Sequence, residues 1–124
     1  MTDEADRKSK LVREVNALPG GAARRLEDKY AVGLLDLVIK LPGHPFFWAE
    51  GKMIDGNVFG PTARQHEEGM RWIKAGVPVL LIGWKRTHLF VSPWTKQANI
   101  ENCFNGPSPW LTTLQNYLNQ KAPK

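Results

Sequence analysis

Two carboxylates and a lysine, Asp36, Glu50 and Lys52, are the residues whose types and spacing best suit chemistry at a bound metal ion. Residues 34–40 and 46–52 both have the apolar, β-branched and aromatic content of strands, and a Pro/Gly-containing turn separates them. If residues 40 and 46 close this hairpin, Asp36 lies directly opposite Glu50. Lys52 then projects from the same face of the sheet as Glu50.

This arrangement would be unfavourable without a cation. Directly opposed carboxylates have Cβ atoms about 5 Å apart and, at an effective dielectric constant of about 20, repel each other by about 3 kcal/mol. Apart from Asp36, residues 34–39 are apolar on both faces, which is typical of a covered strand where an unpartnered carboxylate is costly. The pattern therefore favours a divalent metal site beside Lys52. The simpler alternative is that Asp36 caps a turn while Glu50 pairs with Lys52 in solvent.

Composition fits a single domain of 124 residues with ordinary hydrophobic (42%) and charged (23%) fractions. The net charge of +5 suits a polyanionic partner but does not establish one. A single cysteine, Cys103, excludes an internal disulfide and fits a reducing compartment. The charged N-terminal segment does not resemble a secretory signal, and the best apolar run, residues 77–84, is too short to span a membrane. We therefore expect a cytoplasmic protein that does not bind membranes.

The expected elements indicate a mixed α/β domain, with one sheet flanked by helices. Residues 1–8 are polar and are expected to be disordered. Residues 23–30 favour a short edge strand over a further helical turn, and the helix after Thr62 is expected to turn Met70 and Ile73 inward. The remaining elements are helices over 9–18, 62–75 and 110–119 (within a C-terminal segment 107–124) and strands over 34–40, 46–52, 77–82 and 87–91.

Four segments carry a resemblance to a known superfamily: Gly-Leu-Leu-Asp-Leu-Val (33–38), Phe-Trp-Ala-Glu-Gly-Lys (47–52), Thr-Ala-Arg-Gln (62–65) and Gly-Val-Pro-Val-Leu-Leu-Ile-Gly-Trp (76–84). Over residues 10–86 the chain resembles the PD-(D/E)xK nucleases, and within them the small VRR-NUC branch. That branch is similar to Holliday junction resolvases and is common in phages. The resemblance implies a restriction-endonuclease-like fold with an αβββαβ core.

The resemblance also implies roles for residues of the site. Asp36, Glu50 and the backbone carbonyl of Gly51 would bind the metal, and Lys52 would orient or deprotonate the attacking water. Glu14 would be the acidic residue that such nucleases often carry on the first helix, although a solvated helix residue is the alternative.

Gln65 has two interpretations of equal weight. By resemblance it is the glutamine that follows Ser/Thr on the helix after the motif, and we count it among the candidate catalytic residues. Thr62 and Gln65 also have the spacing of a helix capping box, and both interpretations can hold.

Two positions depart from the superfamily pattern. Leu35 stands where a proline usually precedes the aspartate, which is a common relaxation. Gly51 replaces the usual branched apolar residue, and a glycine inside a strand can weaken or bend it. A bend at Gly51 would displace Lys52 from the site.

The expected activity is Mg²⁺-dependent hydrolysis of DNA phosphodiester bonds, leaving a 5′-phosphate and a 3′-hydroxyl, with Mn²⁺ as a substitute. Magnesium commonly uses only one or two carboxylates, and a metal ion can make a nucleophile from water near neutral pH. The three histidines are dispersed, which argues against a zinc site. Arg24, Arg25 and Arg64 are candidates for phosphate contacts, although each alone is also an ordinary surface charge.

Substrate shape is left open among four-way junctions, flaps, single strands and plain duplex. A homodimer is expected from the small size and the resemblance. If the chain is encoded by a phage, it would act in the host cytoplasm. Two other classes stay open: a DNA-binding module of the same fold without turnover, and a structural or partner-binding protein that uses its C-terminal aromatic residues as an interface.

Overall fold

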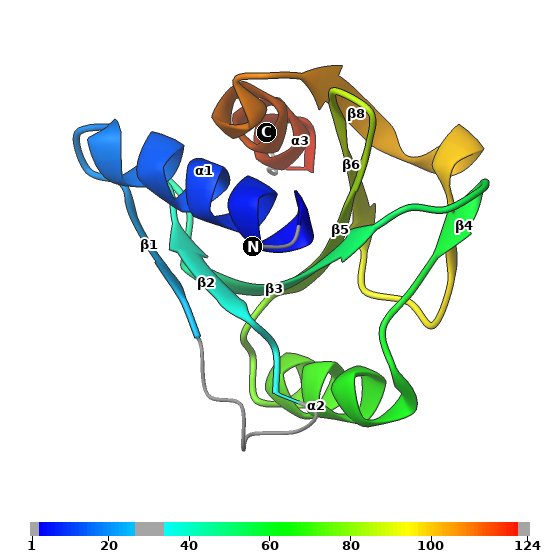
Figure 1. Ribbon diagram of the computed structural model, residues 1–124. Coiled ribbons are helices and arrows are strands. Elements are labelled where there is room, and N and C mark those ends of the chain that lie inside the picture. Colours follow the sequence, from blue (N-terminus) through cyan, green and yellow to red (C-terminus); the bar gives the residue numbers. More distant parts are fainter. Residues whose placement is uncertain (1–2, 27–33, 122–124) are drawn as a thin grey trace.

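The chain folds as one mixed six-stranded sheet with helices on both faces (Figure 1), as a computed structural model shows. The structure describes residues 3–26 and 34–121. In chain order the elements are α1 (Asp3–Ala17), β1 (Ala22–Arg25), β2 (Leu37–Lys40), β3 (Phe47–Met53), β4 (Val58–Phe59), α2 (Ala63–Lys74), β5 (Val79–Lys85), β6 (His88–Pro93), β7 (Ala98–Asn99), a 3₁₀ turn η1 (Ile100–Asn102), β8 (Phe104–Pro107) and α3 (Trp110–Lys121).

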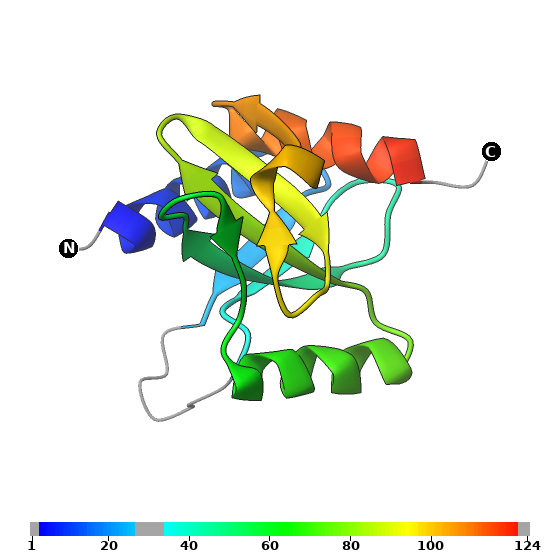
Figure 2. The same ribbon diagram turned by 90° about the vertical axis from the view of Figure 1, so that its right-hand side faces the viewer.

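The sheet has the order β1-β2-β3-β5-β6-β8, and β4 pairs separately with β7. Neighbouring strands are antiparallel except β3 and β5, which run parallel. Parallel neighbours need a crossover connection, and here it contains α2. The sheet curves around α1 and α3, while α2 lies on its opposite face (Figures 1 and 2). The order α1-β1-β2-β3-α2-β5 is the expected αβββαβ core.

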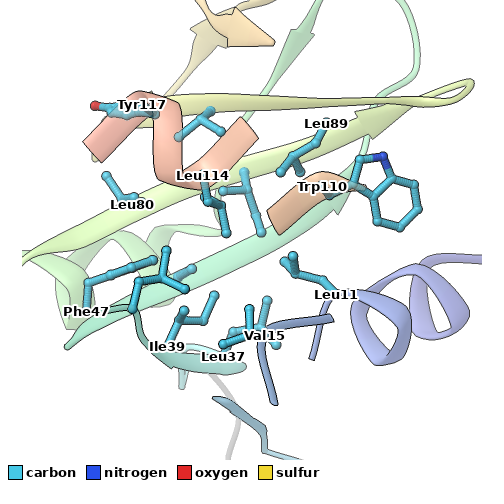
Figure 3. Packing of buried hydrophobic residues seen from close by; sticks show 14 of the residues in the cluster. Leu11, Val15, Leu37, Ile39, Phe47, Leu80, Leu89, Trp110, Leu114 and Tyr117 are labelled. Atoms are coloured by element: carbon cyan, nitrogen blue, oxygen red, sulfur yellow. The ribbon is translucent and has the colours of Figure 1, made fainter. Parts of the chain in front are cut away.

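The main core lies between the concave face of the sheet and α1 and α3 (Figure 3). Leu11 and Val15, four residues apart on α1, are fully buried against alternate residues of the central strands, as helical and strand periodicities require. Trp110 and Tyr117 of α3 join the same cluster. These two C-terminal aromatic residues therefore pack in the core, whereas one alternative from the sequence had assigned the C-terminal aromatic residues to an interface.

The N-terminal prediction was wrong for residues 3–8, which are helical rather than disordered. Three acidic residues, Asp3, Glu4 and Asp6, lie in the first turn of α1, where they interact favourably with the helix dipole. Lys8 is almost fully buried and pairs with acidic groups of the site described below. Tertiary contacts thus order a segment whose composition is that of a solvated tail.

The predicted inward face of α2 was also wrong. Met70 and Ile73 are each 40% exposed. The helix approaches the rest of the fold through Gly69, where an added Cβ would lie 2.2 Å from the Trp94 ring. The prediction considered only apolar side chains and therefore ignored Gly69. Only glycine allows the helix backbone to lie this close to the Trp94 ring. The start of the helix is as expected, because both hydrogen bonds of the Thr62–Gln65 capping box are present.

The predicted strand over 23–30 is present as β1 at Ala22–Arg25, and its remaining residues from 27 onward lie outside the described part of the chain. No described helix is long and apolar enough to cross a membrane.

Candidate functional site

The β2–β3 hairpin has the register expected from the sequence. Leu37 pairs with Ala49 and Ile39 with Phe47, so the same register places Asp36 opposite Glu50. Asp36 directly precedes β2, and its carbonyl accepts a hydrogen bond from the Leu26 backbone N–H at 2.8 Å. The hairpin is therefore held in place on both sides next to the acidic pair.

Glu50 is a buried carboxyl, with a side chain only 3% exposed. Burial, followed by the nearby Asp36 carboxylate, raises the pKa of Glu50 to about 7, although Lys52 and Lys8 act in the opposite direction. Lys52 lies beside it, with Nζ 3.5 Å from Glu50 Oε2. The structure thus brings Asp36, Glu50 and Lys52 together, and it does not support the interpretation of a solvated Glu50–Lys52 pair.

Two carboxylate oxygens of this site have no hydrogen-bond partner among the described residues: Asp36 Oδ1 and Glu50 Oε1. Both atoms are buried. Leaving a buried polar group unpaired costs about 1–3 kcal/mol, and more when it is charged. Such oxygens are suited to coordinating a cation.

Two residues of α1 complete the cluster, and sequence reasoning missed both. The Lys8 ammonium contacts Asp36 Oδ2 and lies 3.0 Å from Glu4 Oε2. The other Glu4 oxygen accepts the Met53 backbone N–H at 3.1 Å. The i,i+4 spacing of Glu4 and Lys8, in register with Leu11, was a signal for a helical turn that could have been used.

Asp36 and Glu4 together raise the pKa of Lys8, although burial alone, the largest single influence, would lower it. The pKa of Glu4 is lowered, because its contacts with Lys8 and the Met53 N–H outweigh the opposing effect of burial. Both shifts favour the charged forms of Lys8 and Glu4. The cation found between acidic groups is a lysine of the chain itself.

Gly51 does not bend the strand, contrary to the concern raised by its departure from the superfamily pattern. β3 pairs with β5 without interruption from Trp48 to Met53. A Cβ at position 51 would lie 2.9 Å from the Trp84 ring and 3.1 Å from Lys8 Cε. The volume that a branched residue would fill is taken by these two side chains.

The structure gives Glu14 a partner on another helix, and its role at a metal stays a prediction. Its carboxylate accepts the Leu111 backbone N–H at 3.0 Å and thereby satisfies a free donor at the start of α3. The acidic α1 residue beside the site is Glu4. Gln65 uses its side chain to cap α2 and accepts the Thr62 N–H at 3.0 Å, so its capping interpretation holds.

The three predicted phosphate-contact residues lie on two elements. Arg24 and Arg25 are on the edge strand β1, where Arg24 pairs with Val38 and Arg25 with Leu37. Leu37 directly follows Asp36 in the chain, so the Arg25 backbone lies next to that of Asp36. Arg64 is exposed in the first turn of α2, on the other face of the sheet from α1. The structure brings Arg25 near the acidic pair and does not group it with Arg64.

The donor set fits a magnesium-type site but not one built from many protein ligands. No group of three or more His, Cys, Asp or Glu side chains in the described residues is arranged to hold a metal ion. Magnesium commonly uses one or two carboxylates and completes its shell with water and substrate phosphate. The unpaired oxygens of Asp36 and Glu50 match that requirement, and the Gly51 carbonyl as a ligand stays a prediction.

A solved structure has a fold similar to that of this chain. No protein-family model matches the chain, and no curated protein matches it. Among solved structures it is similar to Hjc from Archaeoglobus fulgidus, a Holliday junction resolvase of an archaeal hyperthermophile. The identity is 15% and the TM-score 0.61, over 90% of this chain and 98% of that one. The expected restriction-endonuclease-like α/β fold is confirmed.

Proposed function

We propose that the chain is a divalent-metal-dependent endonuclease that hydrolyses DNA phosphodiester bonds and prefers branched DNA. The observation that carries this proposal is the buried Asp36–Glu50 pair with unpaired oxygens next to Lys52. The fold shared with an archaeal junction resolvase supports the class of substrate.

Each residue of the site has a distinct task in this proposal. Asp36 and Glu50 hold Mg²⁺, with the Gly51 carbonyl as a further ligand. When bound, the metal neutralises charge on the phosphate and lowers the pKa of water. Lys52, whose side chain is 24% exposed, reaches solvent from the edge of the site and orients or deprotonates the attacking water. Arg25 is the best-placed of the predicted arginines for a nearby phosphate.

The test is cleavage by the purified protein of a four-way junction, a flap, supercoiled plasmid, linear duplex and single strand, with Mg²⁺, Mn²⁺ or chelator. Cutting that requires the metal and is strongest on branched DNA is expected. Lys52→Met and Glu50→Gln should abolish it. Lys74→Met and Glu67→Gln make the same charge changes on α2 and should not. Full activity of Lys52→Met would overturn the assigned mechanism.

The Lys8 contact favours one alternative, a DNA-binding module of the same fold without turnover, because an internal lysine already neutralises Asp36. This alternative predicts salt-dependent DNA binding but no cleavage of any substrate with either metal.

The other parts of the proposal rest on resemblance. A homodimer would allow two sites to act on one junction, and sedimentation of the pure protein tests it. Membership of the VRR-NUC branch, a phage origin and action in the cytoplasm belong to the same proposal.

A further inference from the structure

Lys8 is an unusual lysine, because its side chain is only 5% exposed while its ammonium lies against two carboxylates. Buried lysines are rare unless they are paired. The pairing here joins separate parts of the chain: Lys8 and Glu4 come from α1, and Asp36 precedes β2. Glu4 is in turn tied to the end of β3 through the Met53 N–H.

The fold makes room for this lysine at one place. The Lys8 stem lies over Gly51, where a Cβ would be only 3.1 Å from Lys8 Cε. Because residue 51 has no side chain, the ammonium can reach Asp36. The Lys8 stem therefore fills the space above Gly51 that a side chain at position 51 would occupy. The contact between Lys8 and Asp36 is thus part of the packing of the site.

The contact uses the same carboxylate that the proposed function assigns to the metal. Asp36 Oδ2 is taken by Lys8, while Asp36 Oδ1 and Glu50 Oε1 have no partner in the described structure. A divalent ion bound to Asp36 would lie close to the Lys8 ammonium, and like charges at that separation in a buried site repel strongly. The two cations would approach different oxygens of the same carboxylate and would compete for its charge.

Resting on the proposed function, we infer that Lys8 is a displaceable internal counter-ion, whose ammonium moves away from Asp36 when a divalent cation binds there. Glu4 offers the ammonium a second partner, because it already lies 3.0 Å from Lys8 Nζ and its own side chain is 38% exposed. Lys8 can thus move toward solvent without losing every acidic contact. In the metal-free protein it keeps the acidic residues neutralised and in place.

Metal binds most readily to the form of the protein in which the Lys8 ammonium has moved away from Asp36. Because this form is only a fraction of the metal-free protein, the apparent affinity for metal is lowered. Lys8→Met keeps most of the stem volume and removes the charge. It should bind divalent cations more tightly, with a dissociation constant lower by on the order of tenfold or more. The same variant should be less stable without metal, because the acidic groups lose their counter-ion.

The test measures Mn²⁺ binding without any cleavage step, from the electron paramagnetic resonance signal of free Mn²⁺. The matched control is Lys10→Met, which removes the same charge from the same helix. Lys10 is exposed and lies 4.7 Å from the Trp110 ring centroid, away from the carboxylates. Tighter binding by Lys8→Met alone supports the inference. Equal affinities in wild type and Lys8→Met overturn it.

A second measurement uses the wild-type chain and therefore does not depend on the variant folding. The side-chain ¹⁵Nζ and ¹³Cε resonances of Lys8 are followed while Ca²⁺ is added. A shift toward solvent-exposed values as the cation binds is expected. Unchanged Lys8 signals at saturating Ca²⁺ would overturn the inference.

The two proposals fail in different ways. If the wild type binds Mn²⁺ and cuts DNA but Lys8→Met binds Mn²⁺ no more tightly, only the counter-ion role of Lys8 is refuted. If neither protein binds Mn²⁺ and neither cuts, both proposals fall.

Discussion

Replacing Glu50 by glutamine should stabilise the metal-free protein at alkaline pH. The carboxyl is 97% buried with one unpaired oxygen, and its pKa rises from an ordinary 4.5 to about 7. At pH 8 the group is ionised in both states, and the shift then corresponds to about 3 kcal/mol of lost stability. The neutral amide of similar shape removes that loss. For a chain of this size the midpoint of thermal unfolding should rise by about 10 °C.

The sign of the effect follows from the direction of the shift. Below the unfolded-state pKa of 4.5, Glu50 is protonated in both states and causes no loss. Between pH 4.5 and 7 the unfolded chain ionises first, so wild-type stability falls relative to Glu50→Gln as pH rises, and the gap is constant above about pH 7.

The assay is thermal and urea unfolding of wild type and Glu50→Gln from pH 4 to 8.5 in the presence of chelator. Glu67→Gln, at an exposed position of α2, is the control and should follow the wild type at every pH. If Glu50→Gln shows no gain at pH 8, or the same gain at pH 4, Glu50 ionises freely in the folded chain. Glu50 would then not belong to a buried acidic pair.

Three further substitutions test the packing at Gly51, the role of Glu14 and the capping box of α2. Gly51→Ala should destabilise by about 1–3 kcal/mol through its clash with the Trp84 ring; an unfolding midpoint equal to wild type would contradict that packing. Glu14→Gln should leave metal-dependent cleavage unchanged, because the Glu14 carboxylate accepts the Leu111 N–H at the start of α3; loss of Mn²⁺ binding would support the assignment of Glu14 as a metal ligand. Thr62→Ala should cost about 0.5–2 kcal/mol in urea unfolding by removing half of the capping box, and a cost near zero would show that the box contributes little.

The hairpin could be predicted because several local signals agree there. The turn sets the loop length, and the alternation of Leu37 and Ile39 against Phe47 and Ala49 fixes which residues face the core. A slip by one residue would turn those four side chains to the other face. The position of Asp36 opposite Glu50 follows from that register. The acidic pair could therefore be predicted from the sequence.

The first two turns of α1 could not be predicted by the same reasoning. Hydrophobic periodicity detects a helix by its apolar stripe, and residues 3–8 have none apart from Ala5. What orders them is polar and tertiary: Glu4 bonds to Met53 and Lys8 pairs with Asp36. Because the expected helix began at Ser9, Glu14 was its only acidic residue, and Glu4 was not considered.

The effect of Gly51 expected from its strand alone differs from its effect in the folded chain. Taken alone, a glycine between Glu50 and Lys52 indicates a weak or bent strand. In the structure the strand is regular, and the missing side chain is replaced by Trp84 from β5 and by the Lys8 stem from α1. Those contacts join positions far apart in sequence, so no local pattern contains them. The glycine and the buried lysine therefore depend on each other: a larger side chain at 51 is compatible with this site only if both Trp84 and Lys8 give way.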